Sequence, residues 1–335
     1  MVSCLNELAL RDSEIHLMSW PVNSEAPFRF EFHENITHYK REEFNDLELL
    51  KLAGKINPDI IFSPGWMDKG YCKVCKKFKS RIPVVTGLDN QWYGTSKQKI
   101  ASLLSRFLVR DKFTHVLAAG EPQKKFAQKL GFNDDNILTG LYSADVSIFD
   151  ASYQKFKEDK IKSLPKRFIY VGRYVDWKGM EEMWEGFLQA KEENNSGWEL
   201  WCLGTGEMYD AKREAEGIKH FGFVQPKNLE EYIKETSVFV LPSRYEPWGV
   251  VVQEYAAAGY PLICTDKVGA ASAFLKDGVN GVLTKSNSVE SLKNAFSKFM
   301  KMDESSILKM GDQSRELALN NSPKIWADKF LSILN

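Results

Sequence analysis

Short runs of apolar residues alternate with longer amphipathic stretches along nearly the whole chain, and this alternation constrains the fold more than any other feature. The runs that we expect to form strands are 14–20, 59–66, 82–89 and 114–120 in the first half, and 167–174, 198–206, 218–224, 237–243 and 261–266 in the second. Strands separated by helical patterns are typical of βαβ units and parallel sheets. We therefore predict an α/β protein with two doubly wound domains in series.

The length and composition of the chain agree with two domains. Its 335 residues are 43% hydrophobic, which is enough for two separate cores. We place the N-terminal domain at 1–148 and the C-terminal domain at 149–320, with 151–166 as a connecting helix or linker. Residues 2–11 have a helical pattern with no strand before them, although a doubly wound domain normally opens with a strand and a glycine-rich turn. The first strand of the N-terminal domain is therefore expected to be missing.

Charge and cysteine content exclude several classes of protein. Lys plus Arg equal Asp plus Glu at 45 each, so nothing indicates binding to nucleic acid. The five cysteines are scattered, which favours a reducing compartment over a disulfide framework. No apolar run approaches the ~18 residues that span a bilayer. We expect a protein of the cytoplasm or of the inner face of the membrane, where its contact would be peripheral. We expect no metal site, and we interpret Cys72 and Cys75 as residues on one face of a helix.

A basic patch interrupts the charge balance in the first half. Residues 69–112 hold eleven Lys or Arg residues but only two acids, Asp89 and Asp111. Its main members are Lys73, Lys76, Lys77, Lys79, Arg81, Lys97, Lys99, Arg106 and Arg110. One interpretation is an ordinary solvated face. The other is a peripheral contact with anionic membrane lipids, which attract clustered basic side chains.

The most informative motif is PSRYEPWGVVVQEYAAAG at 242–259, which sets Glu246 and Glu254 eight positions apart. Gly249 marks the start of a short helix over 250–258, and free N–H groups there favour a phosphate. Carboxylates accept hydrogen bonds from neighbouring hydroxyls, so two of them around a phosphate indicate a nucleotide sugar. In the alternative interpretation, Glu246 caps the helix and Glu254 is solvated or paired with a lysine.

Two basic residues strengthen the nucleotide-sugar hypothesis. Arg173 and Lys178, in YVGRYVDWKG, lie just beyond an expected strand end, where both could neutralise a diphosphate. Taken alone, such residues are usually solvated. The G-x-G at 204–206 has no third glycine, so it predicts a tight turn and does not support a nicotinamide-dependent enzyme.

The segments YVGRYVDWKG, ELWCLGTGE, FGFVQ, EPWGVVVQE and DGVNGVL, within 167–284, resemble the donor-binding half of family 4-type retaining glycosyltransferases of the glycosyl transferases group 1. The resemblance implies a GT-B fold, in which two Rossmann-like doubly wound domains face each other across a cleft. It also implies that 321–335 form a helix crossing back to the N-terminal domain.

The resemblance implies roles for individual residues. Glu254 would accept hydrogen bonds from the ribose, Glu246 would contact hydroxyls of the donor sugar, and Arg173 and Lys178 would hold the diphosphate. The other implied donor contacts are Pro247, Trp248, Gly249 and Val250 beside the phosphates, and Phe223 and Val224 at the base. Asp89 and Asn90 stand where many relatives carry a histidine beside the donor sugar, and Ala273 stands where relatives often have a glutamate.

The implied function is retaining transfer of a hexose from a nucleotide-diphosphate sugar to a glycan or lipid-linked acceptor, in surface polysaccharide or glycolipid synthesis. Attack on the front face of the sugar would require no protein nucleophile. In an alternative mechanism, Glu246 is the nucleophile and acts with Asp89. The chain has no D-x-D motif, so we expect no cofactor and no metal. The alternative function is a non-catalytic nucleotide-sugar-binding partner, or an inactive truncated homologue.

Overall fold

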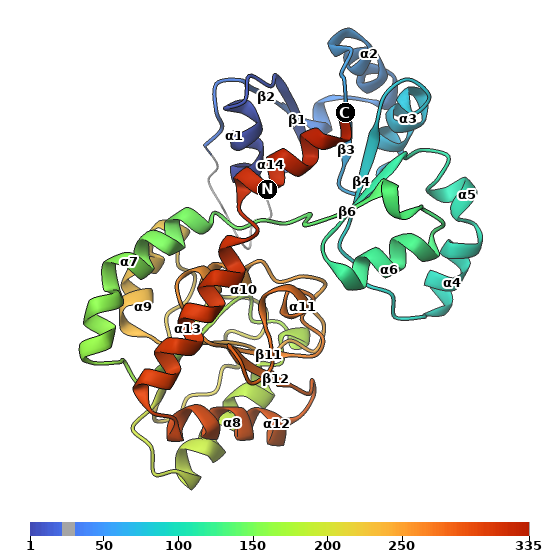
Figure 1. Cartoon of the computed structure of the whole chain (residues 1–335). Helices are drawn as coiled ribbons and strands as arrows, with labels where there is room; N and C mark the ends of the chain where they lie inside the picture. The colour runs from blue at the N-terminus through green and yellow to red at the C-terminus, as the bar shows by residue number, and fades with distance from the viewer. Residues whose placement is uncertain (22–30, 335) are drawn as a thin grey trace. The chain divides into compact units, whose positions relative to one another are not determined.

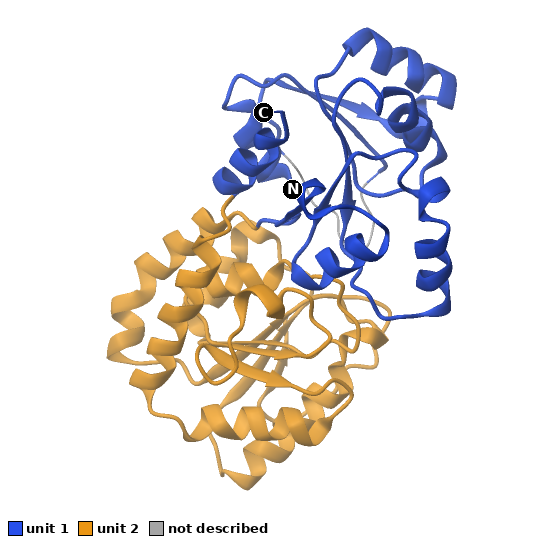
Figure 2. Ribbon diagram, turned by 45° about the vertical axis from the view of Figure 1, so that its right-hand side comes forward, with its two compact units in different colours: residues 1–22, 29–143, 323–335 blue, residues 23–28, 144–322 orange. Residues whose placement is uncertain are grey.

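The computed structural model describes residues 1–21 and 31–334, and every strand pair in these residues is parallel (Figure 1). The alternation of strands and helices confirms the predicted α/β class. The described residues separate into two compact units (Figure 2). Unit 1 contains 1–21, 31–143 and 323–334, and unit 2 contains 144–322.

The main sheet of unit 1 has four strands in the order β3-β4-β5-β6. They are β3 (Ile61–Ser63), β4 (Val84–Leu88), β5 (His115–Ala118) and β6 (Ile137–Thr139). The helices that follow the strands are α3 (Lys69–Phe78), α4 (Ser96–Leu103), α5 (Ser105–Leu108) and α6 (Glu121–Lys129), and α2 (Asp46–Ile56) precedes the sheet. All of β4 is buried, and Phe78 and Phe126 pack in the core around it.

The remaining elements of unit 1 come from both ends of the described chain. Helix α1 (Val2–Ala9) precedes β1 (Ile15–Ser19), which pairs with β2 (Ile36–Lys40) in a two-stranded sheet. Helix α14 (Pro323–Leu331) packs on α1, and Trp326 Nε1 donates a hydrogen bond of 3.1 Å to the carbonyl of Leu141. This contact joins the end of the chain to the loop after β6. No helix in the described residues is long and apolar enough to span a bilayer.

Unit 2 is built on a six-stranded sheet in the order β12-β11-β10-β7-β8-β9. Its strands are β7 (Arg167–Val171), β8 (Glu199–Leu203), β9 (Ile218–His220), β10 (Val238–Leu241), β11 (Leu262–Thr265) and β12 (Gly281–Thr284). The strand order reverses between β7 and β10. In open parallel sheets, ligands bind beyond the carboxyl ends of the strands at such a switch point.

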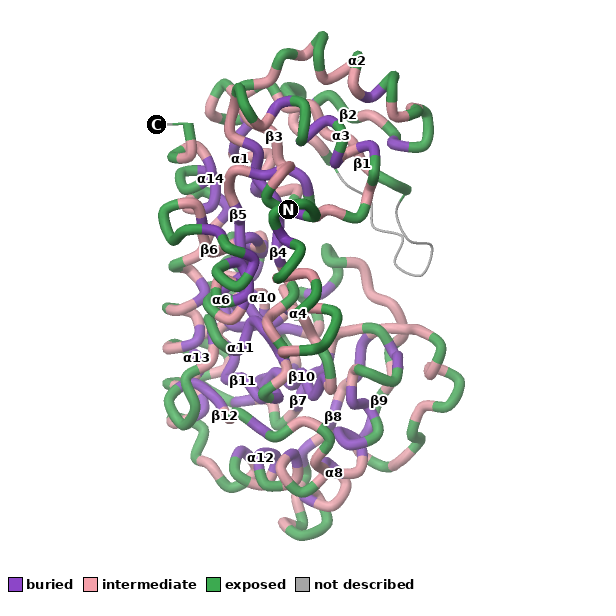
Figure 3. The backbone as a smooth tube through the Cα atoms, turned by 90° about the vertical axis from the view of Figure 1, so that its right-hand side faces the viewer, coloured by how far each residue is buried: buried purple, intermediate pink, exposed green. Residues whose placement is uncertain are grey.

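Two groups of helices cover opposite faces of this sheet (Figures 1 and 3). One group is α8 (Met180–Glu193) and α12 (Val289–Lys301). The other is α7 (Val146–Lys162), α9 (Leu229–Glu235), α10 (Val251–Ala257), α11 (Ala271–Phe274) and α13 (Glu304–Leu319). Short 3₁₀ turns lie at Arg41–Glu43, Asp134–Asn136, Asp176–Lys178, Pro226–Asn228 and Ser332–Leu334. Burial is concentrated on the strands and on the helix faces that contact them, as Figure 3 shows.

Candidate functional site

The loops after β7 and β10 meet at the switch point of unit 2. Gly179 ends the loop after β7 with φ +67°, and a Cβ atom there would lie 2.2 Å from the carbonyl oxygen of Pro242. Only glycine allows this approach. The backbone N–H of Arg244 donates a hydrogen bond of 2.8 Å to the carbonyl of Trp177. These contacts hold the two loops directly against each other.

Arg244 ties the same loops together through its side chain. Its Nε donates to Glu182 on α8 at 2.7 Å, and its Nη1 donates to Asp176 at 2.7 Å. The hydrogen bond to Glu182 raises the pKa of the Arg244 guanidinium, which remains charged. Arg244 was not among the predicted site residues, although its place directly after β10 was an available signal. Its function here is to position the loop that carries Glu246.

Lys178 and Glu246, two predicted site residues, form an ion pair across these loops. Their side chains are only 13% and 14% exposed, so the pair is largely removed from water. An ammonium group has three donors, and Lys178 can therefore bond Glu246 and a phosphate oxygen together. Arg173 lies in the same loop, exposed, with its guanidinium 5.7 Å from the centre of the Trp177 ring. The arrangement places two cations and a carboxylate at one edge of the sheet.

The turn from Glu246 to Gly249 is fixed to the loop after β11. The N–H of Gly269 donates to the Glu246 carbonyl at 3.0 Å, and the N–H of Ala270 donates to the Trp248 carbonyl at 2.8 Å. Gly249 has φ +91°, and a Cβ there would lie 3.1 Å from Glu246 Cγ. The side chain of Trp248 is buried and anchors the turn in the core, while Pro247 is half-buried.

Helix α10 follows this turn and carries Glu254. Burial raises the pKa of the half-buried Glu254 carboxyl to about 7, and the nearby Asp145 acts in the same direction. Within the described residues, no acceptor pairs with the N–H groups of Gly249 and Val250. These two donors and Glu254 thus lie at the start of one short helix, where an anion and a hydroxyl donor could bind.

Gln253 holds α10 in place and was not predicted from the sequence. Its Oε1 accepts a hydrogen bond of 2.8 Å from the N–H of Ala144, and its Nε2 donates to the carbonyl of Ala318 at 3.1 Å. The side chain is fully buried. A buried amide with partners on both sides is costly to lose, so Gln253 is a positioning residue for Glu254.

Phe223 and Val224 lie in the loop after β9, where both are half-buried. The N–H of Gly204 donates to the carbonyl of Gly222 at 2.7 Å, which joins the loops after β8 and β9. A Cβ on Gly204 would lie 1.9 Å from the carbonyl oxygen of Gly172, so the loop after β7 is adjacent too. The predicted tight turn does not form at 204–206: the G-x-G is irregular backbone that packs between neighbouring loops, and the turn begins only at Gly206, whose carbonyl accepts a hydrogen bond of 3.0 Å from the N–H of Tyr209.

Asp89 and Asn90 belong to unit 1, where they follow β4. Asn90 Nδ2 donates to Asp89 Oδ1 at 3.2 Å, and the Tyr142 hydroxyl donates to Asp89 Oδ2 at 3.3 Å. Gln123 Nε2 donates to the Asp89 carbonyl at 3.0 Å. The predicted residues are therefore divided: Asp89 and Asn90 are held in unit 1, and the others lie in unit 2.

The cysteine pair of α3 lies inside unit 1. Cys72 and Cys75 are both buried, and burial raises the pKa of the Cys75 thiol to about 12, which keeps it protonated. Across residues 1–21 and 31–334, no group of three or more His, Cys, Asp or Glu side chains is placed to hold a metal ion.

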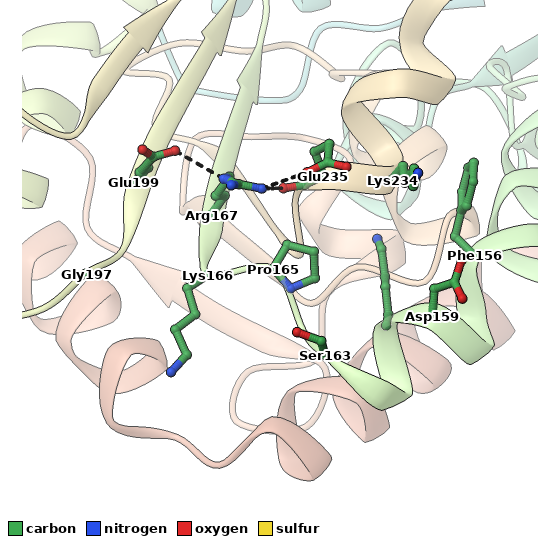
Figure 4. A pocket seen from close by; sticks show the side chains of 11 residues that line it. Phe156, Asp159, Ser163, Pro165, Lys166, Arg167, Gly197, Glu199, Lys234 and Glu235 are labelled. Atoms are coloured by element: carbon green, nitrogen blue, oxygen red, sulfur yellow. Dashed lines mark hydrogen bonds and ion pairs between the residues drawn. The ribbon is translucent and has the colours of Figure 1, made fainter.

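A pocket of about 420 Å³ lies at the other end of the strands in unit 2 (Figure 4). Its wall includes Arg167, which bonds Glu199 at 3.1 Å and Glu235 at 2.9 Å. Arg167 begins β7, whereas Arg173 follows the end of that strand. The pocket is thus separate from the switch-point loops, and these three charges are already paired with one another.

The matched family model and the similar proteins agree on one kind of protein. The family model described as Glycosyl transferases group 1 matches residues 152–317. An uncharacterised glycosyltransferase of Methanocaldococcus jannaschii is 33% identical over 124 residues, which are 35% of this chain and 31% of that protein. The chain thus spans about a third of the length of this curated relative.

Two solved structures share the fold. A glycosyltransferase from Rickettsia africae superposes with a TM-score of 0.74 at 14% identity, covering 99% of this chain and 92% of the other. Anabaena HepE in complex with UDP-glucose superposes with a TM-score of 0.65 at 16% identity, covering 89% and 85%. The fold is GT-B. Residues 152–317 contain both the family match and the switch-point loops of unit 2, and this part of the chain belongs to the glycosyl transferases group 1.

Proposed function

We propose that this chain is a retaining glycosyltransferase that moves a hexose from a nucleotide-diphosphate sugar to a glycan or lipid-linked acceptor, in surface polysaccharide or glycolipid synthesis. The observation that carries the proposal is the meeting of Lys178 and Glu246 at the switch point of unit 2. Arg173 lies in the loop of Lys178, and Glu254 lies on the helix that follows Glu246. A diphosphate flanked by two sugars matches this distribution of cations and carboxylates.

Each group has a proposed role in donor binding. Arg173 and Lys178 neutralise the diphosphate, and the N–H groups of Gly249 and Val250 bond its oxygens. Glu246 accepts hydrogen bonds from the donor sugar, and Glu254 accepts them from the ribose. The base binds at Phe223 and Val224, while Asp89 and Asn90 serve the sugar and acceptor from unit 1. The acceptor class rests on the family resemblance alone.

The proposed chemistry follows from where charge develops. Cleavage of the bond between the sugar and the phosphate leaves negative charge on the nucleoside diphosphate. Arg173 and Lys178 stabilise that charge, and fixed donors of this kind contribute about 3–4 kcal/mol each in the transition state. The acceptor hydroxyl attacks the same face of the sugar, and its proton passes to the departing phosphate oxygen. The anomeric configuration is retained without a protein nucleophile, and no metal is required.

The proposal is tested by incubating the purified chain with UDP-glucose, GDP-mannose and ADP-glucose, in EDTA, with candidate lipid and glycan acceptors. We expect release of one nucleoside diphosphate in EDTA and, by NMR of the product, the anomeric configuration of the donor. Lys178→Ala should lose about 100-fold in rate. Lys301→Ala, an exposed residue at the end of α12 and away from the proposed donor contacts, is the control.

Three results would count against parts of the proposal. Equal rates for Lys178→Ala and the unmodified chain would remove Lys178 from the mechanism. Activity that EDTA abolishes and Mn²⁺ restores would contradict the metal-independent reaction. Nucleotide binding without release from any donor would favour the non-catalytic partner.

A further inference from the structure

The segment α4–α5 of unit 1 exposes its large apolar side chains. Ile100, Leu103, Leu104, Phe107 and Leu108 are 57%, 84%, 43%, 69% and 44% exposed. Their spacing of three and four residues is the one that normally faces a protein core. We call these five residues the apolar stripe. A contiguous stripe of this kind on the surface indicates an interaction site, because isolated apolar residues are ordinary but clustered ones are not.

Polar contacts fix the orientation of this segment. Gln98, on the opposite face, accepts a hydrogen bond of 2.7 Å from the N–H of Tyr93 and donates one of 2.7 Å to the carbonyl of Gln91. The Ser102 hydroxyl donates to the carbonyl of Lys129, and Ser105 is buried. Small and polar residues thus face unit 1, and the large apolar residues face outward. This is the reverse of a helix that packs on its own core.

The surroundings of the apolar stripe are basic. Residues 96–110 contain no acid, and Lys97, Lys99 and Arg106 are exposed and form no ion pair with any residue that the structure describes. A hollow of about 570 Å³ begins at Leu108, and its polar lining includes Lys69, Lys73, Lys76 and Lys112. The one acid in that lining, Asp111, is already paired with Lys76 at 3.0 Å and Lys112 at 2.6 Å.

We propose that the apolar stripe docks unit 1 on the surface of an anionic lipid bilayer. The five apolar side chains would enter the boundary between headgroups and acyl chains, and the flanking cations would bind lipid phosphates. A second copy fits less well: in a two-fold symmetric contact the same patch meets itself, so the cations of one copy would face those of the other. The inference does not depend on the donor site, since it uses only unit 1.

Sedimentation with vesicles tests this proposal on the full chain. Vesicles of phosphatidylcholine alone are compared with vesicles of equal parts phosphatidylcholine and phosphatidylglycerol. We expect binding to the anionic vesicles, weakened by added salt. Leu103→Ser with Phe107→Ser should reduce the partition coefficient at least about tenfold. The control is Leu47→Ser, an exposed leucine on α2 that should leave binding unchanged.

A second variant set separates the contribution of charge. Lys97→Gln, Lys99→Gln and Arg106→Gln together should lower binding to anionic vesicles and remove most of its salt dependence. Lys51→Gln, Lys55→Gln and Lys301→Gln together, three exposed lysines on α2 and α12, remove the same number of charges and are the matched control. All altered side chains are exposed, and unchanged thermal unfolding verifies that each variant is folded.

Some outcomes would overturn the membrane proposal. The first is that the chain does not sediment with vesicles. The second is that Leu103→Ser with Phe107→Ser binds vesicles as well as the unmodified chain does. The third is that light scattering shows a dimer, which these two substitutions dissociate. The last would assign the surface to a second copy. Because donor binding is measured separately, failure of this proposal and failure of the proposed transferase function are distinguishable.

Discussion

Lys178 and Glu246 are 68 residues apart in the sequence, yet their charged ends meet in unit 2. Both side chains are mostly out of water, so each charge depends on the other for compensation. A pair of this kind contributes little net stability, but loss of one partner leaves an uncompensated charge. The pair therefore makes a site sensitive to single substitutions and tolerant of paired ones.

We expect Lys178→Met to lower the free energy of unfolding by about 1–3 kcal/mol. Adding Glu246→Gln should restore most of that loss, because the unpaired carboxylate is removed. Urea denaturation of the two single variants and the double variant measures this coupling. Additive effects would show that the two side chains do not interact in solution. Donor binding should be lost in all three variants.

Burial raises the pKa of the Glu254 carboxyl to about 7 in the folded chain, from an ordinary value of 4.5. Between these values the unfolded chain is ionised while the folded chain still holds the proton. The unfolded state then binds fewer protons, so this group lowers stability as pH rises through that window. Glu254→Gln should stabilise the fold by about 1–3 kcal/mol at pH 8 and have little effect below pH 4.5. Thermal unfolding at both pH values measures the difference.

The same carboxyl should make donor binding depend on pH. Ribose hydroxyls bond the ionised form better, so the affinity for UDP-glucose should rise about tenfold between about pH 6 and about pH 8. UDP-glucose suits this measurement because neither of its phosphates titrates in that range. Glu254→Gln should bind weakly and without this pH dependence. An unchanged pH profile in the variant would contradict the assignment.

At the scale of helices and strands, each of the nine strands expected from the sequence overlaps an observed one, and β2, β6 and β12 were missed. Strand β6 has only three residues and β12 begins with Gly281, which in a sequence indicates a turn. The structure explains this glycine: a Cβ there would lie 2.1 Å from the carbonyl oxygen of Leu262 on the neighbouring strand. The pattern of apolar residues in the sequence cannot predict this close contact between two backbones.

Strand ends and glycine positions in the sequence were enough to place Arg173, Lys178, Glu246 and Glu254 in loops or at a helix start. Arg244 and Gln253 were not found, because their partners lie 62 to 109 residues away. Only the folded chain brings those partners together. The sequence thus predicted where these candidate site residues lie in the fold, but not which residues hold them in position.

Gly179 offers a test of how the loops after β7 and β10 cooperate. Gly179→Ala would place a Cβ against the carbonyl of Pro242 at a positive φ, which forces the loops apart. We expect a loss of about 1–3 kcal/mol in unfolding free energy and at least about tenfold weaker nucleotide binding. Gly197→Ala is the matched control, because a Cβ there meets nothing within 4 Å. Equal effects of both substitutions would contradict the importance of this contact.

At the scale of the whole molecule, the proposed donor contacts are unequally divided between the two units. Unit 2 contains the basic, acidic and backbone groups that we assign to the nucleotide and diphosphate. Unit 1 contains Asp89 and Asn90, and also the apolar stripe. We therefore infer that unit 2 recognises the donor. We also infer that the positions at which unit 1 departs from the family pattern concern the acceptor and the place where that acceptor is found.

The central claim is that unit 2 binds a nucleotide diphosphate through the switch-point loops. Calorimetric titration of UDP, GDP and ADP into the purified chain and into Glu254→Ala tests it most directly. We predict that one nucleotide binds, and that the variant loses about 1.5–3 kcal/mol of binding free energy as charged hydrogen bonds disappear. Absence of binding for all three nucleotides, or equal affinity in Glu254→Ala, would contradict the claim.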